Sequence, residues 1–280
     1  MVDDVTETAG DDLAQRSERI EAEALSEFHR AASPALRDAM GLRLETIDGA
    51  LVSVAARSAN IVINRVIGLG MDSPATVAQL ETIRRVYGRA GVERFFVHAS
   101  AAAEPRPLAG FLEGEGLVRD RGWMKFSRRG NHVTEPAMNL VIREIGPEDA
   151  TAFGRIAGQG FGLGEPAWDV LARLVGRPGW RIFMSFDGGA PAGVGALFVS
   201  DGVGWTDWAA TDPAFRQKGS QSALLARRIN AAVEMGCSLL CTCTGEAVAD
   251  EDQHSYRNIL RAGFIQAGLR PNYSPTGRPV

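Results

Sequence analysis

The sequence predicts an α/β protein built from two halves of similar plan. Apolar runs of strand length alternate with amphipathic stretches of helix length over most of the 280 residues. Both halves follow the same order of elements: strand, glycine-containing turn, long helix, strand, short helix and final strand. In the second half a short basic loop, Arg216-Gln217-Lys218-Gly219, leads from a strand directly into a helix. A loop of this kind in an α/β protein is typical of a site for a phosphorylated cofactor.

The elements of the first half follow from its periodicity and its glycine and proline residues. Residues 1–16 are polar and acidic, which predicts a disordered terminus. A helix is expected over residues 18–31, because Ile20, Leu25 and Phe28 recur near one helical face. Further strands are expected at residues 42–47, 51–55, 60–67, 94–97 and 123–127, and further helices at residues 74–89 and 108–113.

A polar segment separates the halves. Residues 129–137 contain glycine and proline and show no periodicity, so we interpret them as a linker between one domain over residues 17–128 and another over residues 138–280. In the second domain Pro147 and Pro166 each open a helix, because proline suits the first helical position. Its strands are expected at residues 138–145, 181–186, 193–199, 204–210, 238–244 and 264–267, and its later helices at residues 222–235 and 255–262.

Composition narrows the class of protein. The net charge is −4, the two signs are mixed, and no long basic block is present, which argues against nucleic acid or an anionic membrane as the main partner. No apolar run reaches the roughly 20 residues that span a bilayer, and the first residues lack the apolar stretch of a signal peptide. Cys237, Cys241 and Cys243 lack further ligands at metal-binding spacing, so no metal site is expected. We therefore expect a cytoplasmic enzyme or binding protein.

The basic loop has the physical properties of a pyrophosphate site. Gly219 allows the backbone to approach a phosphate closely, and the amides of residues 217–222 can donate in series at the positive end of the helix dipole. Arg216 and Lys218 add positive charge, unless their side chains are simply solvated. The corresponding turn of the first half, residues 68–72, has no basic residue and gains an acid. The sequence therefore predicts one phosphate site, in the second half.

Around this loop, residues 138–273 resemble the GNAT superfamily of acetyl-CoA-dependent N-acetyltransferases. The family's loop has the form Arg/Gln-x-x-Gly-x-Gly/Ala; Arg216 and Gly219 match it, and Gln221 departs from it. The helix that precedes Gly263-Phe264 matches the family's late helix. The first half resembles the same fold more faintly, as in tandem GNAT proteins whose leading domain has lost the loop. The resemblance implies two GNAT-like domains, each a mixed, mostly antiparallel twisted sheet flanked by helices.

The resemblance also implies acetyl-CoA as the acyl donor. In the family, the strand before the loop splays from its neighbour, and its unpaired backbone groups bind the pantetheine arm and the acyl carbonyl. By position these groups belong to residues 209–211, and residues 240–244 form the other lip. The residues expected to bind acetyl-CoA are Ala209, Ala210, Thr211, Arg216, Gln217, Lys218, Gly219, Ser220, Gln221, Ser222, Ser255 and Asn258.

The catalytic groups are less well defined. Family members often carry a tyrosine that acts as the general acid for the leaving thiolate, at the position that Ile259 occupies here. Tyr256 shares a helical face with that position and either reaches the cleft or packs in the core. Asp207, between two tryptophans, either attracts the amine and accepts its proton or faces solvent. Glu165 lies where the family holds substrate, although it also suits a helix start.

Together these features predict direct transfer of an acetyl group from acetyl-CoA to a primary amine of a small molecule or peptide. The oligomeric state is expected to be monomer or homodimer. Among Trp168, Trp180, Trp205 and Trp208, one or two are expected to line an acceptor pocket. The alternative is a non-catalytic acyl-CoA-binding sensor, because the usual tyrosine is missing and Gln221 replaces a small residue.

Overall fold

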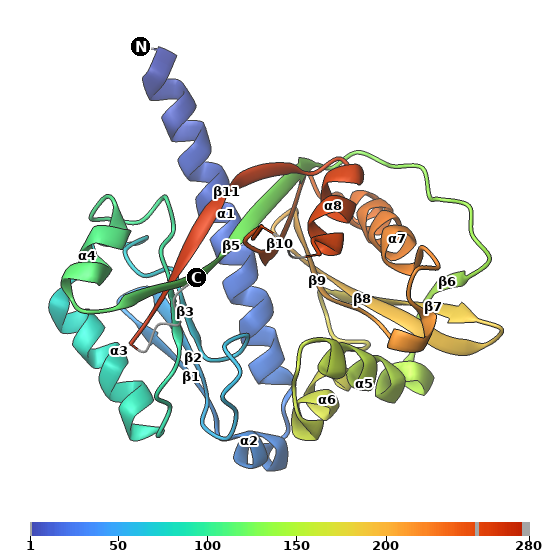
Figure 1. The fold of residues 1–280 in the computed structure, drawn as a ribbon, viewed down its shortest axis with the longest axis horizontal. Helices are drawn as coiled ribbons and strands as arrows, with labels where there is room; N and C mark the ends of the chain where they lie inside the picture. Colours follow the sequence, from blue (N-terminus) through green and yellow to red (C-terminus); the bar gives the residue numbers. More distant parts are fainter. Residues whose placement is uncertain (1, 250–251, 276–280) are drawn as a thin grey trace.

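The computed structural model describes residues 2–249 and 252–275, and side chains from residue 10 onward (Figure 1). The elements of the first half are α1 (Val2–Ala31), α2 (Pro34–Met40), β1 (Leu42–Ile47), β2 (Ala50–Ala55), β3 (Arg65–Ile67), α3 (Val77–Arg89), β4 (Phe96–His98), α4 (Leu108–Gly114) and β5 (Val118–Arg129).

The second half begins at β6 (Val141–Glu144) and ends in β11 (Ile265–Ser274). Between them lie η1 (Pro147–Asp149), α5 (Ala150–Gly160), α6 (Glu165–Ala172), β7 (Trp180–Asp187), β8 (Ala190–Ser200), β9 (Val203–Thr211), η2 (Pro213–Phe215), α7 (Ser220–Glu234), β10 (Leu239–Gly245) and α8 (His254–Arg261).

The described strands form a single sheet in the order β1-β2-β3-β4-β11-β5-β10-β9-β8-β7-β6. Neighbouring strands run antiparallel except at two places, β3 with β4 and β9 with β10, where they run parallel. Helices flank this sheet on both faces (Figure 1). The predicted fold class, a mixed and mostly antiparallel sheet flanked by helices, is confirmed.

The two halves exchange their last strands. β5 ends the first half but lies between β10 and β11, whereas β11 ends the second half but lies between β4 and β5. The two exchanged strands pair with each other along the centre of the molecule, from Ile265 opposite Ser127 to Ser274 opposite Val118 (Figure 1). The strands of the two expected domains therefore belong to one continuous sheet. The segment expected as a linker, residues 129–137, starts with the last residue of β5 and otherwise contains no helix or strand.

Three layers of apolar side chains hold the helices on the sheet. Helices α1, α5 and α6 cover one face of β7, β8 and β9 through a core that includes Phe28, Phe153 and Met184. The opposite face, with Phe183 and Leu197, is covered by α7 and α8. A separate core joins α3 and α4 to the first half of the sheet. The alternation of side chains along each strand explains why neighbouring residues such as Phe183 and Met184 enter different layers.

Helix α1 connects the two halves and differs from its expected extent. Where the sequence suggests disorder over residues 1–16 and a helix from residue 18, the structure has helix from Val2. Ile20, Ala24 and Phe28 form the buried stripe of this helix, and Asp11 makes an ion pair with Arg106 at 2.5 Å. Asp11 and Arg106 lie far apart in the sequence, so local composition could not reveal this contact. Helix α2, which begins behind the cap residue Ser33, was also not expected.

Burial of His29 on α1 predicts a pH dependence of stability. Its Nε2 lies 2.8 Å from Ser53 Oγ, and burial lowers the pKa of His29 to about 4. The unfolded chain takes up this proton near pH 6.5, so stability is complete above that pH and is lost as the pH falls toward 4. We expect about 3 kcal/mol of unfolding free energy to be lost through this residue over that interval.

The test is chemical denaturation of the wild-type protein and of His29→Gln between pH 7 and pH 4. The variant should lose less stability than the wild type as the pH falls, whereas His132→Gln, at an exposed position, should behave as the wild type does. Parallel curves for the wild type and His29→Gln would contradict the assignment.

Candidate active site

Strands β9 and β10 separate partway along their length. They pair only from Val203 opposite Leu239 to Trp205 opposite Cys241, although β9 continues to Thr211 and β10 to Gly245. A last link is the bond that Thr242 Oγ1 donates to the carbonyl of Thr206, at 2.9 Å. Beyond it the strands enclose a cavity of about 400 Å³, lined by Thr206–Ala209 on one side and Thr242–Gly245 on the other. This gap is the splay that the family resemblance implies.

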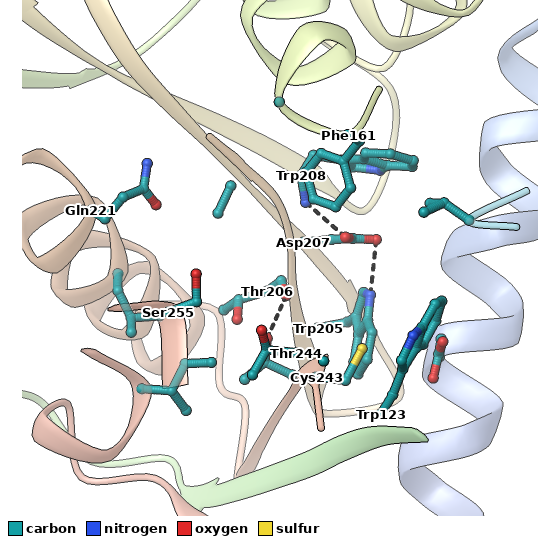
Figure 2. A pocket seen from close by; sticks show the side chains of 18 of the residues that line it. Trp123, Phe161, Trp205, Thr206, Asp207, Trp208, Gln221, Cys243, Thr244 and Ser255 are labelled. Atoms are coloured by element: carbon teal, nitrogen blue, oxygen red, sulfur yellow. Dashed lines mark hydrogen bonds between the residues drawn. The ribbon is translucent and has the colours of Figure 1, made fainter. Parts of the chain in front are cut away.

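A β-bulge in β9 places Asp207 at this cavity. Asp207 pairs with Ala196 and Ala210 with Val194, so β9 has one residue more than β8 in this interval. Trp208 adopts the left-handed region, with φ of 46°, which re-aims the strand. Its backbone N–H donates to Asp207 Oδ1 at 2.7 Å, and the indole N–H of Trp205 donates to Oδ2 at 3.1 Å (Figure 2). Burial raises the pKa of Asp207, and these two donors partly oppose that effect.

A buried arginine supports the bulge from the other face. Arg228 of α7 donates to the carbonyls of Leu224 at 3.0 Å, Ala196 at 3.2 Å and Asp207 at 3.3 Å. Burial lowers the pKa of Arg228 to about 10, against the attraction of Asp207. The guanidinium thus joins the carbonyls of Ala196 on β8 and Asp207 on β9, which are opposite each other at the bulge. Sequence reasoning missed this residue, because an arginine inside an amphipathic helix normally faces solvent.

The basic loop has the backbone expected of an anion site. Gln217 and Gly219 both adopt left-handed conformations, with φ of 65° and 79°, and α7 starts at Ser220 without a side-chain cap. Its first amides therefore point out of the helix end. Arg216 is exposed, while the ammonium of Lys218 lies 2.5 Å from Asp187 Oδ2. The positive charge of Lys218 is thus partly neutralised, which sequence alone did not indicate.

The side chains of the first three residues of α7 differ in burial and in their hydrogen bonds. Ser220 is buried, and its Oγ lies 2.7 Å from Ser185 Oγ, so only its backbone faces the loop. Gln221 lines the cavity and donates its amide to the carbonyl of Ala210 at 2.8 Å and to Thr211 Oγ1 at 2.9 Å. The amide of Gln221 thus ties α7 to the end of β9. Ser222 is half-buried at the helix start.

Helix α8 supplies the outer wall of the cavity. Ser255, Asn258 and Ile259 line it, and Figure 2 shows Ser255 facing the same space as Gln221. Tyr256 is not among the lining residues; its ring lies edge-on to Phe126, with 4.9 Å between ring centroids. The expectation that Tyr256 reaches the cleft is therefore corrected to the core-packing alternative. The reason is the turn of α8, which directs residues 255 and 259, four apart, to the cavity.

Glu165 is also placed away from the cavity. It is the exposed first residue of α6, where a carboxylate interacts favourably with the helix dipole. Among the expected tryptophans, Trp205 and Trp208 line the cavity, whereas Trp180 packs against Phe198 and Trp168 donates to the carbonyl of Leu163 at 2.6 Å.

The far wall of the cavity comes from the first half, through the exchanged strand β5 and helix α1. Trp123 of β5, Arg65 of β3 and Glu21 of α1 line it, together with Ile61 and Val62. Sequence reasoning missed these residues because nothing local marks them. Their proximity to β9 depends on the exchange of β5 and on the path of α1 across both halves.

Two of these wall residues, Glu21 and Arg65, belong to a buried group of five charges, which we call the ionic cluster. Its members are Glu18, Glu21, Arg65, Lys125 and Arg270. Glu21 is bonded to Arg65, to Lys125 at 2.5 Å and to Arg270 at 2.8 Å. Burial alone would raise the pKa of Glu21, but these cations hold it well below its usual range. Glu21 therefore stays ionised and fully occupied by its partners.

Two of the cysteines, Cys241 and Cys243, lie on β10. Cys241 is buried, and Cys243 lines the cavity, where burial raises the pKa of its thiol to about 12. Cys243 is thus a neutral wall residue.

The described part of the chain contains no group of three or more side chains placed to hold a metal ion. In residues 2–249 and 252–275 no helix is long and apolar enough to cross a membrane.

Comparison with known proteins identifies the fold. No family model matches the chain, and no curated protein matches it in sequence. Among solved structures, a GCN5-related N-acetyltransferase from Kribbella flavida is similar over 94% of this chain and 96% of its own, with 18% identity and a TM-score of 0.65. A GCN5-related N-acetyltransferase from Sphaerobacter thermophilus is similar over 88% of this chain and 86% of its own, with 16% identity and a TM-score of 0.59.

A tandem GNAT protein from the clavulanic acid biosynthesis pathway is similar over 70% of this chain and 68% of its own, with 14% identity and a TM-score of 0.51. The protein therefore has the fold of the GCN5-related N-acetyltransferases. Within that fold it has the tandem form, in which the splayed strands and the basic loop occur in the second half.

Proposed function

We propose that the protein is an N-acetyltransferase that binds acetyl-CoA between β9 and β10 and transfers its acetyl group directly to a primary amine. The observation that supports this most strongly is the separation of the two strands around a cavity, next to the uncapped start of α7. A thioester arm needs such a gap, and a pyrophosphate needs such a helix start.

The residues present fit acetyl-CoA. Backbone amides of residues 217–222 would hold the pyrophosphate, with Arg216 adding charge. Ala209 is exposed at the cavity and is suited to bond the pantetheine arm, whereas the carbonyl of Ala210 already accepts from Gln221. Asn258 and Ser255 line the cavity from α8 and would lie beside the arm.

Asp207 is suited to act on the acceptor. The bound ammonium loses one proton to become a nucleophile and a second as the carbon–nitrogen bond forms, and the sulfur gains one proton as the thioester carbon–sulfur bond breaks, so one proton is released overall. A carboxylate whose pKa is raised by burial is a better base than an exposed one. We assign to Asp207 the binding of the ammonium and the acceptance of its proton.

Ile259 lines the cavity at the position of the family's tyrosine and has no proton to give. Ser255 lies one helical turn earlier on the same face and also lines the cavity, so we assign to its hydroxyl the relay of the second amine proton to the sulfur, in which it takes up one proton as it gives up another. Ser255→Ala is then expected to slow turnover and to leave the affinity for acetyl-CoA nearly unchanged.

Gly219→Glu tests the cofactor site. A glutamate costs about 1–2 kcal/mol in the left-handed backbone of Gly219 and brings a negative charge to the phosphates. We expect calorimetry to detect no acetyl-CoA binding at micromolar concentrations. The control is Gly202→Glu in the β8–β9 turn, which has the same charge change at a φ of 69° and should keep wild-type affinity.

Retained affinity in Gly219→Glu would contradict the loop assignment. The sensor alternative is separated by CoA release with a panel of primary amines. Gly219-dependent binding of acetyl-CoA with turnover supports the transferase, whereas the same binding without turnover on any amine favours the sensor.

A further inference from the structure

The cavity has two chemically different ends. The end near α7 and α8 carries amide and hydroxyl groups, those of Gln221, Asn258 and Ser255. The other end is formed by aromatic rings from both halves of the chain (Figure 2). Its rings are Trp123, Phe161, Trp205 and Trp208. Acetyl-CoA enters, under the proposed function, from the first end, so the aromatic end faces the acceptor.

The aromatic rings are fixed by their own packing. Phe161 lies edge-on to Trp208, with 5.0 Å between centroids, and Phe28 of α1 packs behind Trp208 at 5.8 Å. Trp123 is held by the guanidinium of Arg65, 5.0 Å from its ring centroid, and by His98 at 4.9 Å. Rigid walls of this kind favour a flat or apolar molecule over a hydroxylated one, because they offer few hydrogen-bond partners.

The charges at this end leave one carboxylate for a ligand. Glu21 is already bonded to three cations of the ionic cluster, and Arg65 is bonded to Glu21. Within the residues that the structure describes, the carboxylate of Asp207 makes no ion pair and accepts only from Trp208 N–H and Trp205 Nε1. Arg228 also lines the cavity, but its guanidinium donates to three backbone carbonyls and makes no hydrogen bond to the carboxylate of Asp207.

We propose that the acceptor is a primary amine carried on an aromatic or apolar body, without a carboxylate beside the amine. Its ammonium would bind Asp207, and its body would lie among Trp123, Phe161 and Trp208. A carboxylate next to the amine would face Asp207, while the cations that line the cavity, Arg65 and Arg228, are already bonded to Glu21 and to backbone carbonyls. A cation held between a carboxylate and tryptophan faces gains both ionic and cation–π attraction. This inference rests on the proposed function and adds its substrate class.

The experiment compares four probes by calorimetry, each with and without CoA present. The probes are 2-phenylethylamine, 2-phenylethanol, phenylalanine and glucosamine. We expect 2-phenylethylamine to bind, and the alcohol, the amino acid and the aminosugar each to bind at least about tenfold more weakly. Equal or tighter binding of phenylalanine, 2-phenylethanol or glucosamine would overturn the proposal.

Two variants assign the recognition to residues. Asp207→Asn keeps the shape of the side chain and should bring 2-phenylethylamine to the affinity of 2-phenylethanol. Trp123→Leu should weaken the amine about tenfold while the affinity for acetyl-CoA stays at the wild-type value. Asp201→Asn, an exposed turn residue, removes the same charge and should change neither. Melting temperatures of all variants show that each is folded, and wild-type amine affinity in Asp207→Asn would overturn the proposal.

The two proposals fail in different ways. If acetyl-CoA binds through Gly219 but no amine binds, the acceptor class is wrong and the cofactor site stands. If the amine binds through Asp207 but acetyl-CoA does not bind, the transferase is wrong and the class of ligand for the aromatic end stands.

Discussion

A fragment of residues 135–280, produced without the first half, is expected to be unfolded, although it contains the whole sequence that resembles an acetyltransferase. β5 lies between β10 and β11, so its removal leaves β11 without a partner and β10 paired only with β9. It also removes Phe126 from its core and exposes residues of the same cluster, such as Leu240 and Phe264. Loss of α1 also uncovers Trp208 on β9. The free energy of unfolding of a domain is about 5–15 kcal/mol. The free energy lost with a central strand is expected to be larger than this.

The matched control is the same cut with both fragments present. Residues 1–134 and 135–280, produced together, should assemble and show cooperative unfolding, because the cut falls in a segment without helix or strand. Circular dichroism and size-exclusion chromatography distinguish the cases. A cooperative transition in the isolated fragment 135–280 would show that the exchanged strand is dispensable.

Glu21→Gln is expected to destabilise the protein by about 3–5 kcal/mol, the cost of breaking a buried ion pair by removing one partner. The substitution leaves Arg65, Lys125 and Arg270 with Glu18 as the only carboxylate in the ionic cluster. Three buried cations cannot be compensated by one anion in a low-dielectric interior. Glu21 is 1% exposed, so water cannot replace it.

Chemical denaturation of Glu21→Gln should be compared with Glu23→Gln, which removes the same charge from an exposed position of α1 and should be nearly neutral. In the double variant Glu21→Gln with Lys125→Met, one cation is removed as well, so part of the lost stability should return. If Glu21→Gln lowers the free energy of unfolding by less than about 1 kcal/mol, the prediction is contradicted, because a loss of that size is typical of exposed ion pairs.

Local chemistry explains which parts of the molecule were predictable. The strand, basic loop and helix over residues 204–235 depend on alternation, a glycine and an amphipathic stripe, all of which are properties of neighbouring residues. β1 was placed at its observed bounds for the same reason. By contrast, β5 and β11 were predicted several residues too short, because the missed residues include polar side chains that are buried, such as Asp120, Arg270 and Asn272, and so lack the expected apolar run.

The candidate site was predictable only in part. Asp207, Gln221, Ser255 and Asn258 were expected at the site and do line the cavity. Tyr256 was ambiguous in sequence because positions 255, 256, 258 and 259 all lie within one turn, and only the docking of α8 decides which face the cavity. The expected roles of these residues remain predictions.

Periodicity, glycine residues and comparison of the two halves were enough to predict the class of fold, the tandem plan and the half that carries the basic loop. Only the tertiary structure decided that β5 and β11 are exchanged, that Trp123, Arg65 and Glu21 close the cavity around Asp207, and that Tyr256 packs against Phe126. The physical reason is distance along the chain. Pairing between strands and burial of charges join residues more than 100 positions apart, and no local pattern records which of them will meet.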